Sequence, residues 1–206
     1  MLVNVRFFSI ILCILTGCNS NLERLPVLGE VQEINGKKVY HTIPSFTFIN
    51  QDSQLITGHT FKEKVYVADF FFTSCPTICP KMAQQMLRLY HHFEGEARVL
   101  FLSHSIDTKY DTVDQLKNYA TQLGVNDSRW HFVTGEKEAL YAIAEDYFNV
   151  VFEDDSAPGG YNHTGRFILI DEQKRIRSYC NGVSPSEVDE FILNIEKLLS
   201  ERAHKG

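Results

Sequence analysis

Apolar residues in the first half of the chain fall into short runs and one helix-like stripe. The alternation in Ile43–Phe48 predicts a strand, and the polar residues 51–60 predict a turn region. The apolar run Val65–Phe72 predicts a buried strand, and Lys81–Phe93 predicts an amphipathic helix that Gly95 ends. The inward stripe of that helix consists of Met82, Met86, Tyr90 and Phe93.

The second half of the chain repeats this alternation of strands and helices and then closes with a hairpin. The predicted elements are strand 98–103, a helix capped by Asp111 or Thr112, strand 130–133, helix 136–148, a hairpin of strands 167–171 and 176–179, and a last helix opened by the capping box Ser184–Glu187. This order predicts an α/β fold with a central mixed β-sheet flanked by helices, a C-terminal β-hairpin and a closing helix.

The N-terminus has the layout of a bacterial secretory signal. Residues 7–15 are apolar but too few to span a membrane. They run into Leu15-Thr16-Gly17-Cys18, which resembles a lipobox, where a lipoprotein precursor is cut and its cysteine acylated. The alternative is a plain signal peptide in which Cys18 is incidental. We expect a lipoprotein signal peptide at 1–17, a membrane tether at 18–40 and one folded domain at 41–206, held extracytoplasmically on the periplasmic side of a membrane.

Composition and charge fit a single folded domain plus a tether. The chain has 206 residues, and its 44% hydrophobic content is enough for an ordinary core. The formal net charge of −6, without a basic patch, argues against nucleic-acid binding. Of the five cysteines, Cys13 lies in the signal and Cys18 in the lipobox, so the others cannot build a disulfide scaffold. We interpret Cys180 as a structural or incidental thiol.

The most distinctive chemistry lies in the turn Cys75-Pro76-Thr77-Ile78-Cys79-Pro80, between the predicted strand and helix. The start of a helix favours thiolate. Cys75 and Cys79 are i and i+4, so their sulfurs face the same way if the first turn is helical. Thiolates perform disulfide exchange and also bind Cu(I) or zinc. In an oxidising compartment, a close pair tends to form a disulfide unless it is reduced or metallated.

Three landmarks in order resemble the Sco/SenC family. They are the cysteine turn, the segment Ser105-Ile106-Asp107 with Asp111 and Thr112, and the loop Tyr161-Asn162-His163-Thr164. The resemblance extends roughly from Leu25 to Leu199. It implies a thioredoxin-like fold and a copper protein needed to assemble cytochrome c oxidase.

The resemblance also implies roles for individual residues. It places one copper ion, Cu(I) or Cu(II), on Cys75, Cys79 and His163, and it matches Asp107 to the family's aspartate after the second strand. The implied partners are the copper-bearing subunit of cytochrome c oxidase, other periplasmic copper chaperones and thioredoxin-like reductants. Two positions depart from the family pattern: Thr108 replaces the usual proline after that aspartate, and Asn162 replaces an acid before the histidine.

The residues themselves support this site in part. Two thiolates and one imidazole suit Cu(I) and can also hold Cu(II). His163 follows Pro158-Gly159-Gly160, which we interpret as a flexible segment that lets the ligand move, although a solvated loop histidine is the alternative. Asp107 either supports His163, a backbone group or a partner, or simply starts a turn.

Two further groups of residues offer weaker candidates. His104 ends the predicted strand near Asp107 and could approach the copper edge. Met82 and Met86 carry soft sulfur, but their helical spacing favours core packing.

Three functions remain open from the sequence. The first is a copper metallochaperone for the binuclear copper site of cytochrome c oxidase. The second is an extracytoplasmic thiol–disulfide oxidoreductase with no obligatory metal. The third is a thiol peroxidase, because Pro44 to Phe72 followed by a cysteine is similar to peroxiredoxin-like chains; the missing peroxidatic motif before Cys75 makes it the weakest. Only copper binding requires His163, so metal content discriminates between the first two.

Overall fold

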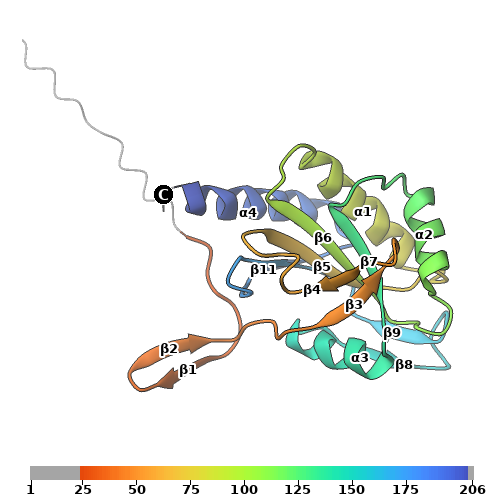
Figure 1. Cartoon of the computed structure of the whole chain (residues 1–206), viewed down its shortest axis with the longest axis horizontal. Helices are drawn as coiled ribbons and strands as arrows, with labels where there is room; N and C mark the ends of the chain where they lie inside the picture. The colour runs from red at the N-terminus through yellow and green to blue at the C-terminus, as the bar shows by residue number, and fades with distance from the viewer. Residues whose placement is uncertain (1–23, 204–206) are drawn as a thin grey trace, which may run out of the picture.

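The computed structural model describes residues 24–203 and contains a central seven-stranded sheet of order β11-β10-β5-β6-β7-β3-β4 (Figure 1). The middle strands β5 (Val65–Phe71), β6 (Val99–Ser105) and β7 (Trp130–Thr134) are parallel. Strand β10 (Arg166–Ile170) pairs antiparallel with β5, and β3 (Thr47–Asn50) pairs antiparallel with β7. The predicted central mixed sheet is therefore confirmed.

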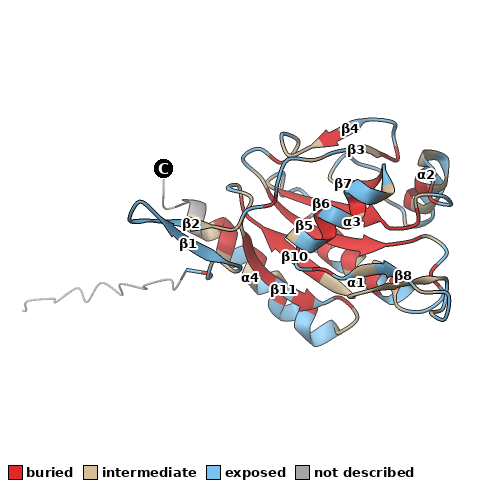
Figure 2. Cartoon of the chain, turned by 90° about the horizontal axis from the view of Figure 1, so that it is seen from below, coloured by how far each residue is buried: buried red, intermediate tan, exposed pale blue. Residues whose placement is uncertain are grey.

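Helices cover both faces of this sheet, as its buried middle strands require (Figure 2). They are α1 (Cys79–His92), α2 (Val113–Gln122), α3 (Lys137–Asp146) and α4 (Pro185–Ala203). On one face, Tyr90 of α1 packs against Trp130. On the other face, Tyr147 at the end of α3 packs against Phe70. Helix α4 lies beside α1, where Arg88 and Asp189 form an ion pair.

The predicted C-terminal hairpin and closing helix are also present. Strand β11 (Ile176–Asn181) pairs antiparallel with β10. The Ser184 Oγ atom accepts a hydrogen bond from the Glu187 backbone N–H at 3.5 Å, as expected of the capping box. Within residues 24–203, no helix is both long and apolar enough to cross a membrane.

The segment before β5 differs from the prediction in two places. The strand predicted at Ile43–Phe48 begins only at Thr47, because Pro44 has no N–H to give to a sheet. The predicted polar turn region contains a further strand, β4 (Leu55–Thr57), which pairs antiparallel with β3 at the sheet edge. A three-residue edge strand with only one buried side chain carries too little hydrophobic pattern to be recognised.

The predicted tether contains ordered structure in its second half. Strands β1 (Val31–Ile34) and β2 (Lys37–Tyr40) form an antiparallel hairpin that projects from the sheet (Figure 1). Before the hairpin, the Leu28 backbone N–H donates to the Ile176 carbonyl at 2.8 Å. The predicted signal and the lipobox cysteine Cys18 lie outside the described residues. The domain boundaries at 17 and 40 stay predictions.

Candidate metal centre

Cys75 and Cys79 lie between the end of β5 and the first residue of α1. Cys79 is the first residue of α1, and Pro80 follows in the first turn, where a missing N–H costs nothing. Cys75 lies in the preceding turn, and its backbone N–H donates to the Phe72 carbonyl at 3.3 Å. The two side chains are 7% and 3% exposed, so a ligand held by them is largely shielded from water.

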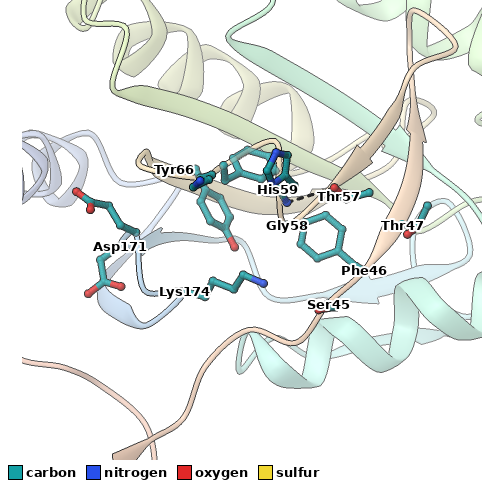
Figure 3. A pocket seen from close by; sticks show the side chains of 12 residues that line it. Ser45, Phe46, Thr47, Thr57, Gly58, His59, Tyr66, Asp171 and Lys174 are labelled. Carbon is teal, nitrogen blue, oxygen red and sulfur yellow. Dashed lines mark hydrogen bonds between the residues drawn. The ribbon is translucent and has the colours of Figure 1, made fainter.

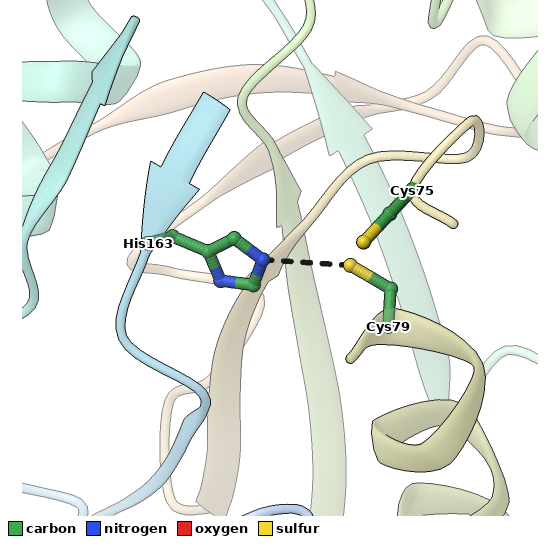
Figure 4. Close-up of side chains that lie close together, drawn as sticks. All are labelled: Cys75, Cys79 and His163. Atoms are coloured by element: carbon green, nitrogen blue, oxygen red, sulfur yellow. Dashed lines mark hydrogen bonds between the residues drawn. The ribbon is translucent and has the colours of Figure 1, made fainter. Parts of the chain in front are cut away.

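His163 reaches these cysteines from a distant part of the chain. It ends β9 (Tyr161–His163), which pairs antiparallel with β8 (Val151–Glu153). The predicted loop is thus a short hairpin, with Pro158-Gly159-Gly160 in the connection between its strands. The His163 Nε2 atom lies 3.5 Å from the Cys79 Sγ atom (Figure 4). The Cys75 and Cys79 Sγ atoms and one nitrogen of His163 all lie within 4.8 Å of one another.

The neighbours of the two thiols shift their pKa values in opposite directions. The hydrogen bond with Cys79 is the main cause that lowers the pKa of Cys75, and His163 adds to it. The same hydrogen bond, together with burial, raises the pKa of Cys79. The Thr77 Oγ atom lies 3.6 Å from the Cys75 Sγ atom and is a further partner. Cys75 is therefore the thiol that ionises first and the better nucleophile near neutral pH.

Asp107 does not contact His163 directly. Its Oδ1 atom accepts hydrogen bonds from the Tyr161 hydroxyl at 3.0 Å and from the Tyr110 backbone N–H at 3.2 Å. Tyr161 precedes His163 by two residues on β9, so the two side chains share one face of the hairpin. Asp107 thus holds the strand that presents the histidine. Sequence reasoning missed Tyr161, although its place in the loop motif was visible.

The other sequence candidates lie outside this cluster. His104 is fully buried on the opposite face of the sheet, stacked on Phe70 with ring centroids 4.6 Å apart. Met82 and Met86 are buried in the core, as predicted. Cys180 is buried as a free thiol, and burial raises its pKa to about 12, which makes it a poor nucleophile.

A buried carboxylate beneath the cysteines was not identified from the sequence. Asp69 is 4% exposed, and its Oδ1 atom has no hydrogen-bond partner in the described part of the chain. It lines a cavity of about 10 Å³ together with Cys79 and Ser103. Such a volume holds about one water molecule. The available signal was a lone acid inside the apolar run that forms β5.

A larger pocket of about 490 Å³ lies at the other end of β5 (Figure 3). It is lined by Tyr66 near the start of that strand, by Phe46, and by Lys174 in the β10–β11 turn. None of the three clustered ligands lines it, so it is separate from the candidate metal centre.

The fold and this cluster together define a class of protein: a mixed α/β domain with two cysteines at a helix start and a histidine opposite them. The chain matches the family model described as SCO1/SenC over residues 35–200. It is 29% identical to the SCO1 protein homolog of Bacillus subtilis (strain 168) over 167 residues, which cover 80% of this chain and 86% of that protein.

Two solved structures extend this similarity to the fold. A SCO1/SenC family lipoprotein from Bacillus anthracis str. Ames is 29% identical with a TM-score of 0.71, covering 77% of this chain and 95% of that chain. BsSco is described as having a disulfide switch and as a member of the Sco family of cytochrome c oxidase assembly proteins. It is 28% identical with a TM-score of 0.68, covering 77% of this chain and 93% of that chain. The chain belongs to the SCO1/SenC family and has the thioredoxin-like fold expected from the resemblance.

Proposed function

We propose that this protein binds one copper ion through Cys75, Cys79 and His163 and serves the assembly of cytochrome c oxidase. The observation that carries the proposal is the convergence of two thiol sulfurs and one imidazole nitrogen within 4.8 Å. Soft thiolates favour Cu(I), and the imidazole suits Cu(II) as well, so the donor set fits either oxidation state. Family membership and the described role of BsSco in oxidase assembly support the client.

The burial of the site fits exchange of copper with a partner. Both sulfurs are shielded from bulk water, whereas His163 is only half-buried on a short hairpin. A partner that approaches the hairpin would meet the histidine first. In this proposal the protein delivers copper to the binuclear copper site of the oxidase, or prepares the thiols of that site to receive it.

Copper titration of the reduced soluble domain, residues 24–206, tests the proposal. We expect one copper per chain in the wild type. His163→Ala should weaken Cu(II) binding by more than about tenfold, since even partners of metal ligands cost that much when removed. Cu(I) binding should fall far less, because the thiolates dominate binding of the softer ion.

A matched control comes from His91, an exposed histidine on α1 that is not part of the cluster. His91→Ala should bind both ions as the wild type does. Unchanged Cu(II) binding in His163→Ala would remove the histidine from the site.

A second candidate function is thiol–disulfide exchange without an obligatory metal. The lowered pKa of Cys75 beside a second buried cysteine favours it. Such an enzyme needs both cysteines, and His163 would assist it only by lowering the pKa of Cys75. If the metal-free His163→Ala variant reduced disulfides of an oxidase copper domain as fast as the wild type, and neither took up copper, this second function would replace the first.

We further propose that the chain is a lipoprotein held through Cys18 on the extracytoplasmic side of a membrane. The lipobox-like sequence before Cys18 and the lipoprotein relative from Bacillus anthracis support this location. The anchor would keep the metal centre close to a membrane-embedded client.

A further inference from the structure

A buried carboxylate ties the cysteine turn to the neighbouring strand. Asp111 has no exposed surface, and its Oδ2 atom accepts from the Thr73 backbone N–H at 3.0 Å and from the Ser105 hydroxyl at 2.6 Å. Its Oδ1 atom accepts from the Thr73 hydroxyl at 2.5 Å. Thr73 lies two residues before Cys75, so these contacts hold the backbone that leads into the first cysteine.

Capping of α2 does not account for this arrangement. The sequence allowed Asp111 or Thr112 as the cap, and the structure gives that role to Thr112, whose Oγ atom accepts from the Gln115 backbone N–H at 3.3 Å. Asp111 instead points away from its own helix, toward the ends of β5 and β6. Burial raises its pKa, while the bonds from Ser105 and Thr73 oppose that rise. A buried carboxylate is costly to keep unless such donors compensate it.

The same loop also holds the histidine strand. The Asp111 backbone N–H donates to the Asp107 carbonyl at 2.9 Å. The Asp107 carboxylate in turn accepts from the hydroxyl of Tyr161, two residues before His163. Residues 106–112 therefore form a bridge, with Asp111 holding the cysteine turn at one end and Asp107 holding the histidine strand at the other.

We propose that Asp111 is a positioning residue: through Thr73 it sets the position of Cys75 relative to Cys79, and through the 106–112 bridge it sets the spacing between this pair and His163. The copper part of this inference rests on the proposed function. Its thiol part does not, because the spacing of the two sulfurs also sets how readily they form a disulfide.

Three variants test the role of Asp111 in the reduced soluble domain. Asp111→Ala removes all three acceptor contacts, Asp111→Asn keeps one acceptor oxygen, and Thr73→Val removes only one hydroxyl at nearly constant shape. We expect about tenfold weaker Cu(II) binding and a shifted thiolate-to-Cu(II) absorption band for Asp111→Ala. Asp111→Asn and Thr73→Val should show smaller changes in the same direction.

The midpoint potential of the cysteine pair provides a readout that needs no copper. The clamp fixes the backbone that leads into Cys75, so its loss should change the equilibrium between the two thiols and the disulfide. A tenfold change in that equilibrium corresponds to a shift of about 30 mV in the potential. Ile195→Val is the control, because it removes one buried methyl group from α4 and lowers the Tm without changing Thr73 or the 106–112 bridge.

The outcomes separate the two proposals. A change in the copper band or the potential of Thr73→Val or an Asp111 variant, beyond that of Ile195→Val, supports the positioning role. If these variants only lose thermal stability, as Ile195→Val does, Asp111 is structural and the inference is wrong. If Asp111→Ala fails to fold, Asp111→Asn and Thr73→Val decide. A wild type that binds no copper would refute the proposed function, while the potentials would still test the clamp.

Discussion

Two buried titratable side chains, Asp69 and His104, should give the folding stability opposite pH dependences that mask each other. They lie on adjacent strands, and the His104 Nδ1 atom is 3.2 Å from the Asp69 carbonyl oxygen. Burial raises the pKa of Asp69 from 3.8 to about 7, while Ser103 opposes the rise. Burial lowers the pKa of His104 from 6.5 to about 4. The folded protein therefore prefers the neutral form of both side chains.

The sign of each contribution follows from these shifts. Folded Asp69 binds its proton more tightly than the unfolded chain does, so stability is lost as the pH rises from about 4 to about 7. Folded His104 binds its proton less tightly, so stability is lost as the pH falls from 6.5 toward 4. At 1.36 kcal/mol per pKa unit, the full contributions are about 4 kcal/mol for Asp69 and about 3 kcal/mol for His104.

Asp69→Asn removes the first contribution and leaves the second. Relative to the wild type, the free energy of unfolding of the variant should rise by about 1.4 kcal/mol per pH unit between pH 4 and pH 7. Urea unfolding of the metal-free, reduced domain at several pH values measures this, with fluorescence of the buried Trp130 as the signal. His104→Gln should show the opposite trend. In the double variant both pH-dependent contributions should be absent.

The prediction concerns how the difference in free energy of unfolding between the variant and the wild type changes with pH. The absolute size of that difference does not matter. Replacement of a buried side chain changes stability by a constant amount at every pH through packing alone. A difference between Asp69→Asn and the wild type that does not vary with pH would refute an elevated pKa for this carboxyl. It would place a partner, such as a water in the adjacent cavity, on the Oδ1 atom.

Three further results are expected. In the unreduced domain, Cys75 and Cys79 should form a reversible disulfide that blocks copper uptake while Cys180 stays free, and mass spectrometry after alkylation would expose a bridge to Cys180 instead. Cys18→Ala should release the protein from the membrane fraction or stop its processing; a variant as firmly bound and as fully processed as the wild type would contradict the lipoprotein proposal. Met86→Ala should lower the free energy of unfolding by about 2–5 kcal/mol, because Met86 is completely buried; a loss below about 1 kcal/mol in urea unfolding would contradict its core role.

The sheet centre could be predicted from the sequence because its signals are local. Strand β5 is buried at every position, so its apolar run alone identifies it. The capping box at Ser184 and the apolar stripe of α1 are likewise contained within a single helix each.

The β1–β2 hairpin was missed although its turn signal was present. Asn35-Gly36 has positive φ angles of 53° and 72°, as a tight two-residue hairpin turn requires. The flanking strands carry no buried face, so the hydrophobic pattern that normally identifies a strand was absent. Strands β8 and β9 are only three residues each, too short for such a pattern.

In the candidate metal centre, too, some features have a local sequence signal and others depend on long-range contacts. Cys79 lies only four positions after Cys75, so the short turn between them keeps the two cysteines close, although only Cys79 belongs to the helix. His163 lies 84 residues from Cys79, and its approach depends on how β9 is placed. The Asp107–Tyr161 bond, across 54 residues, that helps to place β9 has no local signature. The family resemblance supplied His163, and the structure supplies the contact that presents it.

The structure holds the residues of the proposed metal centre with unequal firmness. Cys79 is built into α1, and Cys75 follows a backbone segment clamped by Asp111. His163 ends a three-residue strand, and its Nδ1 atom has no hydrogen-bond partner in the described part of the chain. Ligating histidines usually donate this second N–H to a carboxylate or carbonyl, which fixes the ring.

The residue next to the histidine points elsewhere. Asn162 donates to the Asp154 carboxylate within the β8–β9 hairpin, so that carboxylate stabilises the turn and not the imidazole. An imidazole without this support reorients at lower cost than the two sulfurs do. Loss of the histidine would leave a two-thiolate site that still suits Cu(I) and holds Cu(II) poorly. If copper binds as proposed, this geometry would keep Cu(I) on the two cysteines and let the binding of Cu(II) change with the movement of one side chain.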